Sequence, residues 1–123
     1  MVLVDTSVWI DHLRKGDAAL RSALEAGQVL MHPFVLGELA CGNLSNRAGL
    51  FALLCNLPQA PVATDAEALG LIDGHALMGR GIGYIDAHLL ASAALAAPTR
   101  LWTRDRRANV AVDLNLGFQP KVH

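Results

Sequence analysis

Short apolar runs alternate with longer helical patterns along this chain, and this alternation is the feature that most constrains its fold. The runs that read as strands are "VLVD" at 2–5, "VLMH" at 29–32 and "RLWT" at 100–103. Strands that are separated by helices pair in parallel, because each helix returns the chain to the edge at which the previous strand began. We therefore predict an α/β fold, in which a parallel sheet is covered by helices.

Polar residues mark where two of the predicted helices begin. Thr6 or Ser7 is placed to cap a helix that follows the first strand. Thr64 and Glu67 have the spacing of a capping box, in which two side chains satisfy backbone N–H groups at a helix start. Asp65 lies between these two residues, so we expect it to need no role beyond that helix start.

The composition fits one folded domain over residues 1–123. Hydrophobic residues make up 53% of the chain and charged residues 17%, which excludes a disordered chain and supplies the apolar surface of one core. No apolar run reaches the roughly 18 residues that span a bilayer, and no signal sequence opens the chain. We therefore expect a soluble, cytoplasmic protein. Cys41 and Cys55 lie in Leu- and Ala-rich helical patterns, so we predict buried free thiols.

Four acidic residues stand at positions that suggest chemistry. Asp5 and Asp105 follow strand-like runs, at the end of a parallel sheet where α/β folds bind ligands, while Glu38 and Asp86 project from apolar helical segments. Singly, each could cap a helix, offset a helix dipole or bond a backbone N–H. Together they predict a cluster of carboxylates, whose mutual repulsion requires protons or a cation. Oxygen ligands favour Mg²⁺ or Mn²⁺ over Zn²⁺, so we predict a metal ion as the partner of the Asp5 carboxylate.

A histidine and a group of arginines are the other candidates for chemistry. His88 follows Asp86 by two residues on a predicted helix and faces another way, so we expect it to pack rather than to bind a metal. The net charge of −1 gives by itself no argument for a nucleic-acid partner. The segment "RLWTRDRR" is nevertheless basic, and its arginines are Arg100, Arg104, Arg106 and Arg107. A solvated helix start explains this group unless a negatively charged ligand lies nearby.

Four segments in this order resemble the PIN-domain ribonucleases of the VapC toxin type: "VDTSVWIDHLR", "VLGELACG", "GIGYIDAHLLASA" and "LWTRDRR". The resemblance covers nearly the whole chain and places an acid in each segment. It implies a small three-layer α/β/α sandwich with a mainly parallel central sheet. It also implies a frequent homodimer and a toxin that is neutralised by a small antitoxin protein.

The same resemblance implies roles for individual residues. The residues that match the family's catalytic acidic quartet, which binds Mg²⁺ or Mn²⁺, are Asp5, Glu38, Asp86 and Asp105. The residues that match its hydroxyl positions, which orient the acids or a bound water, are Thr6, Ser7 and Thr103. The predicted N-terminal helices also carry more apolar residues than one helical stripe requires, which fits an antitoxin partner.

The chemistry of this residue set favours hydrolysis of RNA. A divalent ion held by carboxylates lowers the pKa of a bound water and stabilises charge on a phosphate, and one acid can help to deprotonate that water. A negatively charged pocket needs a basic rim to hold an RNA backbone, so we predict RNA contacts from Arg104, Arg106 and Arg107. The alternative is a catalytically inactive PIN-fold module that binds RNA or protein, against which the four intact acids weigh.

Overall fold

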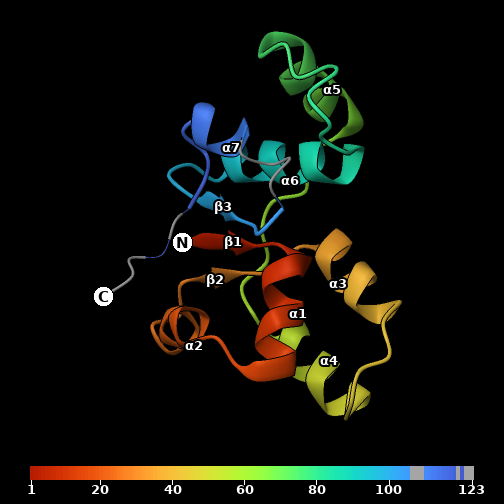
Figure 1. Ribbon diagram of the computed structural model, residues 1–123, viewed down its shortest axis with the longest axis vertical. Helices are drawn as coiled ribbons and strands as arrows, with labels where there is room; N and C mark the ends of the chain where they lie inside the picture. Colours follow the sequence, from red (N-terminus) through yellow and green to blue (C-terminus); the bar gives the residue numbers. More distant parts are fainter. Residues whose placement is uncertain (106–109, 119, 121–123) are drawn as a thin grey trace.

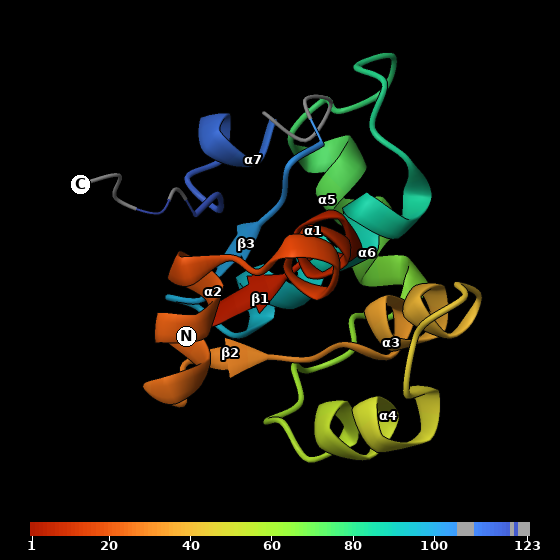
Figure 2. The ribbon, with the colours of Figure 1, turned by 60° about the horizontal axis from the view of Figure 1, so that its bottom comes forward.

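Three parallel strands form the centre of the molecule in a computed structural model, which describes residues 1–105, 110–118 and 120. The strands are β1 (Val2–Val4), β2 (Val29–Leu30) and β3 (Arg100–Trp102), and they lie in the order β2-β1-β3. Both neighbours pair with β1 in parallel, as the arrows of β1 and β2 show in Figure 2. The predicted parallel sheet is therefore confirmed.

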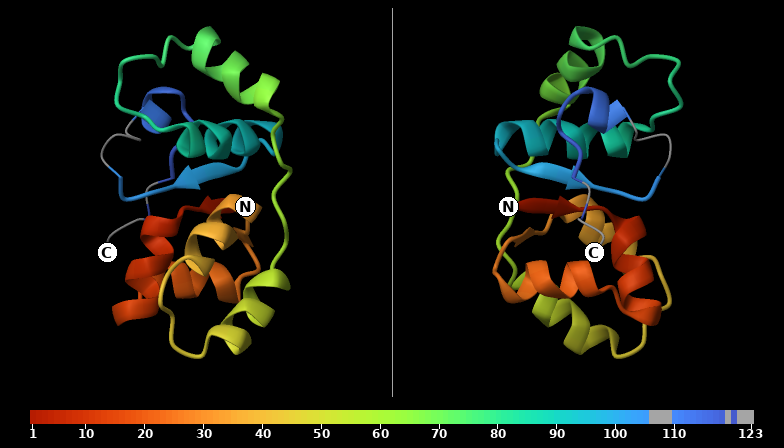
Figure 3. Two further views of the ribbon diagram at one scale, coloured as in Figure 1. Left: turned by 90° about the vertical axis from the view of Figure 1, so that its right-hand side faces the viewer. Right: turned by 60° about the vertical axis from the view of Figure 1, so that its left-hand side comes forward.

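Helices cover both faces of this sheet. Those along the described chain are α1 (Thr6–Lys15), α2 (Ala18–Glu25), α3 (Pro33–Ala40), α4 (Arg47–Cys55), α5 (Asp65–Gly74), α6 (Tyr84–Leu95) and α7 (Val110–Asp113). Helices α1 to α4 lie on one side of the sheet and α5 to α7 on the other (Figures 1 and 3). This arrangement confirms the α/β/α sandwich.

Burial explains why the apolar runs became the sheet. All three residues of β1 are buried, which is typical of a central strand covered by helices on both faces. In α6 the residues from 87 to 93 are all buried, so that helix forms the main cover of one face. Trp9 and Trp102 are each only 3% exposed and belong to the core.

The start of α1 differs from the sequence prediction in a way that affects the candidate site. Asp5, rather than Thr6 or Ser7, occupies the N-cap position, and its side chain makes no capping hydrogen bond. The carboxylate of Asp5 is therefore available for other contacts. The predicted capping box at α5 is confirmed, since Thr64 and Glu67 each accept the backbone N–H of the other.

The prediction of buried thiols is wrong, because Cys41 and Cys55 are both exposed. Both residues lie at the C-terminal ends of short helices in the outer layer. Helix α4 buries only Leu54, although its sequence is apolar nearly all around, and α3 buries only Val35 and Leu39. In the part of the chain that the structure describes, no helix is long and apolar enough to cross a bilayer.

Candidate active site

The four acids predicted from the sequence line one cavity of about 360 Å³. Asp5 and Asp105 reach it from the C-terminal ends of β1 and β3, while Glu38 comes from α3 and Asp86 from the first turn of α6. The parallel sheet produces this meeting, because the C-terminal ends of β1 and β3 lie at the same edge. The other lining residues are Thr6, Ser7, Ile10 and Ile85.

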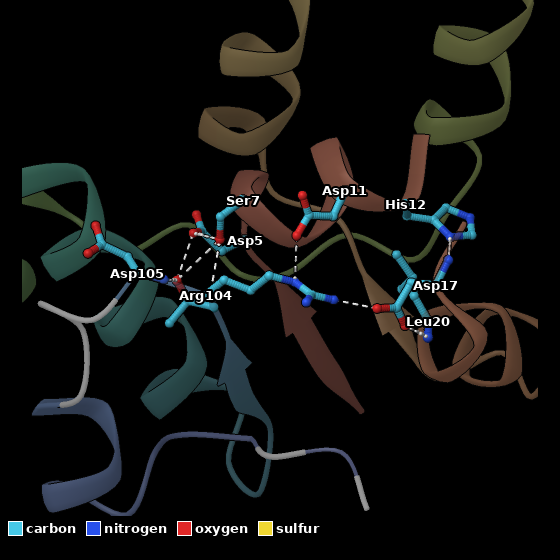
Figure 4. Close-up of polar contacts among 9 residues, drawn as sticks. Asp5, Ser7, Asp11, His12, Asp17, Leu20, Arg104 and Asp105 are labelled. Carbon is cyan, nitrogen blue, oxygen red and sulfur yellow. Dashed lines mark hydrogen bonds and ion pairs between the residues drawn. The ribbon is translucent and has the colours of Figure 1, made fainter. Parts of the chain in front are cut away.

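Asp5 is held by hydrogen bonds of both its side chain and its backbone. The residue is 7% exposed, and its Oδ2 accepts a hydrogen bond of 2.8 Å from the Ser7 hydroxyl (Figure 4). A second hydrogen bond of 2.8 Å comes from the Thr103 hydroxyl. The backbone N–H of Asp5 donates to the carbonyl of Trp102 at 2.9 Å, which ties the end of β1 to the end of β3. The Asp5 carboxylate thus has two hydrogen-bond partners within the protein. The sequence interpretation had named only a metal ion as its partner.

The same two hydroxyls also hold the segment that carries Asp105. The backbone N–H of Asp105 donates to Thr103 Oγ1 at 3.1 Å, and the backbone N–H of Arg104 donates to Ser7 Oγ at 3.0 Å. Ser7 and Thr103 therefore connect one acid to the backbone of the other. Both contacts agree with the orienting role that the resemblance implies for these hydroxyls.

The carboxylates are close enough to influence one another electrostatically. Burial raises the pKa of Asp86 from 3.8 to about 6, and the negative charges of Asp5, Asp105 and Glu38 add to this rise. The pKa of Glu38 is also raised, first by burial and then by the charge of Asp5. Like charges within one cavity produce this pattern, and a cation would relieve it.

The donor set of the cavity fits a hard divalent cation. Asp5, Glu38, Asp86 and Asp105 offer oxygen ligands only, which Mg²⁺ and Mn²⁺ prefer. The hydroxyl of Thr6 is buried at the cavity wall, close to the Glu38 carboxylate, whose pKa it acts to lower. Among the residues that the structure describes, no three acidic, histidine or cysteine side chains already stand close enough to share one ion. Mg²⁺ is commonly held by one or two carboxylates together with water molecules, and such a site needs no third protein ligand.

Comparison with known proteins identifies the family. The sequence profile of the PIN domain matches residues 2–113. The chain belongs to the PIN-domain family. It is 50% identical over 111 residues to ribonuclease VapC32 of Mycobacterium tuberculosis, from strains CDC 1551 / Oshkosh and ATCC 25618 / H37Rv, and the match covers 90% of both chains. The predicted resemblance to VapC-type PIN proteins is thus confirmed.

A solved structure supports the PIN fold independently of close sequence similarity. The structure of FitAB bound to an IR36 DNA fragment superposes with a TM-score of 0.64 at 18% identity, and the match covers 92% of this chain and 91% of that chain. At this identity the likeness concerns the fold alone. All four acids of the cavity lie within the region that the PIN profile matches.

Asp65 of this PIN domain has a role that the sequence interpretation excluded. Its carboxylate accepts a hydrogen bond of 2.8 Å from the Tyr84 hydroxyl and lies 3.0 Å from Nε2 of His88. His88 is buried and packs against the rings of Phe34 and Tyr84, outside the acidic cavity, as predicted. Asp65 thereby connects the start of α5 to the first turns of α6. The sequence separation of 23 residues left no local signal for this contact.

Of the three arginines predicted to contact RNA, the structure describes only Arg104. Arg106 and Arg107 lie outside the described residues. Arg104 forms ion pairs with Asp11, at 3.1 Å, and with Asp17. Nothing tests its predicted RNA contact, and these ion pairs give its guanidinium a competing role.

Two isoleucines at the cavity were missed by sequence reasoning. Ile10 and Ile85 are 43% and 40% exposed, although both are large and apolar. Ile10 lies one helical turn after Thr6, and Ile85 immediately precedes Asp86. Their closeness in sequence to Thr6 and Asp86 was the signal that could have placed them at the cavity.

Proposed function

We propose that this PIN domain is a ribonuclease that hydrolyses RNA phosphodiester bonds with Mg²⁺ or Mn²⁺, and that it is the toxin of a toxin-antitoxin pair. The observation that carries the proposal is the meeting of four carboxylates in one cavity, where Asp86 has a pKa of about 6. The relatives named ribonuclease VapC32, which are similar over 90% of this chain, support the activity. The PIN profile over residues 2–113 supports its location in one domain spanning 1–123.

The surroundings of Asp5 and Asp86 indicate what each would contribute to such a reaction. A divalent ion, when bound by Asp5, Glu38, Asp86 and Asp105, supplies a water of lowered pKa and stabilises charge on the phosphate. Ser7 and Thr103 hold Asp5 in one orientation through two hydrogen bonds of 2.8 Å. The pKa of Asp86, about 6 in the metal-free cavity, would fall when a cation binds, so its carboxylate would serve as an ionised ligand.

Sequencing of RNA ends after brief expression in living cells tests this proposal against the alternative of an inactive binding module. The proposed ribonuclease produces new RNA ends at defined sites, and these ends are absent when Asp86→Asn is expressed at the same level. A binding module that has lost catalysis produces the same RNA ends as Asp86→Asn. The recurrent sites also identify the RNA that is cut.

A groove beside the acidic cavity is the surface that we propose for the antitoxin. The groove has a volume of about 660 Å³, and its apolar residues include Leu13, Leu44, Leu50 and Leu53 from α1, α4 and the loop before α4. Leu53 is 69% exposed and adjoins the other apolar residues of the groove, so that together they form an exposed apolar patch. Ile10 borders both the groove and the acidic cavity, so a segment bound in the groove reaches the acids.

Replacing Leu53 with Lys should weaken antitoxin binding about tenfold or more, because a charge at the centre of an apolar contact is left desolvated. RNA cleavage by the isolated chain should stay unchanged. The matched control is Val62→Lys, which changes an apolar residue of 52% exposure outside the groove. Calorimetric titration with the small protein encoded beside this chain measures the effect. Equal losses in the two variants would place the antitoxin elsewhere.

We also propose a homodimer that acts in the cytoplasm, where RNA and the antitoxin are found. The VapC-type resemblance supports the dimer, as do exposed apolar residues on the side of the sheet that α5 to α7 cover. These are Leu69 on α5, Tyr84 and Leu95 on α6, and Met78 between these two helices. Light scattering of the purified chain tests this point, and a monomer at micromolar concentration would contradict it.

A further inference from the structure

Arg104 connects three elements around the acidic cavity. It follows β3, and its guanidinium reaches α1 and the residue before α2, where Nε lies 3.1 Å from Asp11 Oδ2 and Nη2 contacts Asp17 Oδ2 (Figure 4). Its own backbone N–H donates to Ser7 Oγ at 3.0 Å. The residue therefore fixes the exit of β3 at two points, one through the backbone and one through the side chain.

Asp17, one of the two carboxylates that Arg104 contacts, is itself held in place. Asp17 caps α2 by accepting the backbone N–H of Leu20 at 2.9 Å, and its own backbone N–H donates to His12 Nδ1 at 3.0 Å. Its side chain is 18% exposed. Burial works to raise the pKa of Asp17, but the hydrogen bond from Leu20 and the charge of Arg104 outweigh it, so this pKa is lowered. Asp17 is thus a fixed, ionised anchor.

The charge balance of this group disfavours a free phosphate-binding arginine. Two carboxylates face one guanidinium, so the trio of Asp11, Asp17 and Arg104 carries a net charge of −1. An RNA phosphate would have to displace both carboxylates or approach them against their repulsion. The planar fork of Arg suits the bridging of two carboxylates, which a Lys ammonium reproduces poorly.

We infer that Arg104 is a positioning residue, whose ion pairs with Asp11 and Asp17 hold the segment from Thr103 to Asp105 so that the Asp105 carboxylate lies in the acidic cavity. Asp105 follows Arg104 directly in the chain, so contacts that fix the backbone at Arg104 also limit where the Asp105 carboxylate can lie. That backbone is bonded to Thr103 Oγ1, which in turn bonds Asp5. The part of this inference that concerns Asp105 as a metal ligand rests on the proposed function.

Hydrogen exchange tests the positioning without any reference to activity. In Arg104→Met, the amides of residues 103–105 should exchange about fivefold faster, which is the size of effect that loss of an exposed ion pair allows. The double variant Asp11→Asn, Asp17→Asn should give the same increase, since Asn still caps α2. Lys15→Met is the control, because Lys15 is an exposed cation at the end of α1, near the same turn. Unchanged exchange in Arg104→Met would overturn the inference.

Titration with Mn²⁺ alone provides a second test, because electrostatics and positioning predict opposite changes in Mn²⁺ affinity. Removal of a positive charge near an acidic cavity strengthens cation binding by electrostatics. Loss of positioning instead weakens it, and we expect about tenfold weaker Mn²⁺ binding by Arg104→Met, as for other residues that orient metal ligands. Adding Asp11→Asn and Asp17→Asn to Arg104→Met should cause no further loss, because all three act as one unit. Equal or tighter binding by Arg104→Met would contradict the inference.

RNA binding distinguishes positioning from direct phosphate contact. With single-stranded RNA and the Asp86→Asn background, which prevents cleavage, Arg104→Met should leave the salt dependence of the dissociation constant unchanged. A phosphate contact would instead lower the slope of log K against log salt by about 0.7. Failure of the wild-type chain to bind Mn²⁺ would count against the proposed function, whereas the exchange experiment would still decide the role of Arg104.

Discussion

Asp86→Asn is expected to lower the rate of RNA cleavage by about 10²-fold or more, because the metal ion would lose one of its carboxylate ligands. Asn has nearly the same shape as Asp, but it carries no negative charge for a metal ion. Asp86 lies at the N-terminal turn of the buried helix α6, so the change leaves the core intact. The measurement is the initial rate of cleavage of a labelled RNA in Mn²⁺.

Asp73→Asn is the matched control for this prediction. Asp73 is an exposed acid near the end of α5, and it does not line the acidic cavity. Asp65 would be a poorer control, because it bonds Tyr84 and His88 on the helix that carries Asp86. Asp73→Asn should cleave at the wild-type rate. A similar loss in both variants would mean that the acids of the cavity have no special role.

The metal-free stability of Asp86→Asn should exceed that of the wild type at neutral pH. The pKa of Asp86 is about 6 in the folded chain against an ordinary value of 3.8. An acid with a raised folded pKa makes the protein lose stability as pH rises from the unfolded pKa to the folded pKa, and the loss is complete above about pH 6. We expect the wild type to lose about 3 kcal/mol over this range, whereas Asp86→Asn avoids that loss.

Thermal melting in chelator at pH 4 and pH 7.5 measures this difference. The melting temperature of Asp86→Asn should lie about 5–10 °C above that of the wild type at pH 7.5, and the two should converge at pH 4. Mn²⁺ at a hundredfold excess over its dissociation constant should stabilise the wild type by about 2.7 kcal/mol and Asp86→Asn far less. A lower melting temperature of Asp86→Asn in chelator, with an equal rise of both in Mn²⁺, would make Asp86 a structural cap.

The sequence was sufficient to predict the sheet and the acids, because both depend on local order along the chain. An apolar run such as Val2–Val4 can only be buried between two layers, and an acid that follows it must emerge at the edge of the sheet. Asp5 and Asp105 were found in this way. Glu38 and Asp86 were predicted because a carboxylate within an apolar helical segment is costly to bury unless it faces a polar site.

The contacts that hold these acids could not be predicted in the same way, because they join distant parts of the chain. The ion pair of Arg104 with Asp17 spans 87 residues, and the hydrogen bond of Thr103 with Asp5 spans 98. Only the packed sheet brings these side chains together. The exposure of Cys41 was missed for a related reason, since an apolar helix in the outer layer buries one narrow side.

Cleavage of RNA by the purified chain in Mn²⁺ and in chelator tests the central claim most directly. The acidic cavity predicts cleavage in Mn²⁺, complete loss of cleavage on removal of the metal by chelation, and recovery when Mn²⁺ is restored. Cleavage that continues at the same rate in chelator would contradict a metal-dependent reaction at Asp5, Glu38, Asp86 and Asp105.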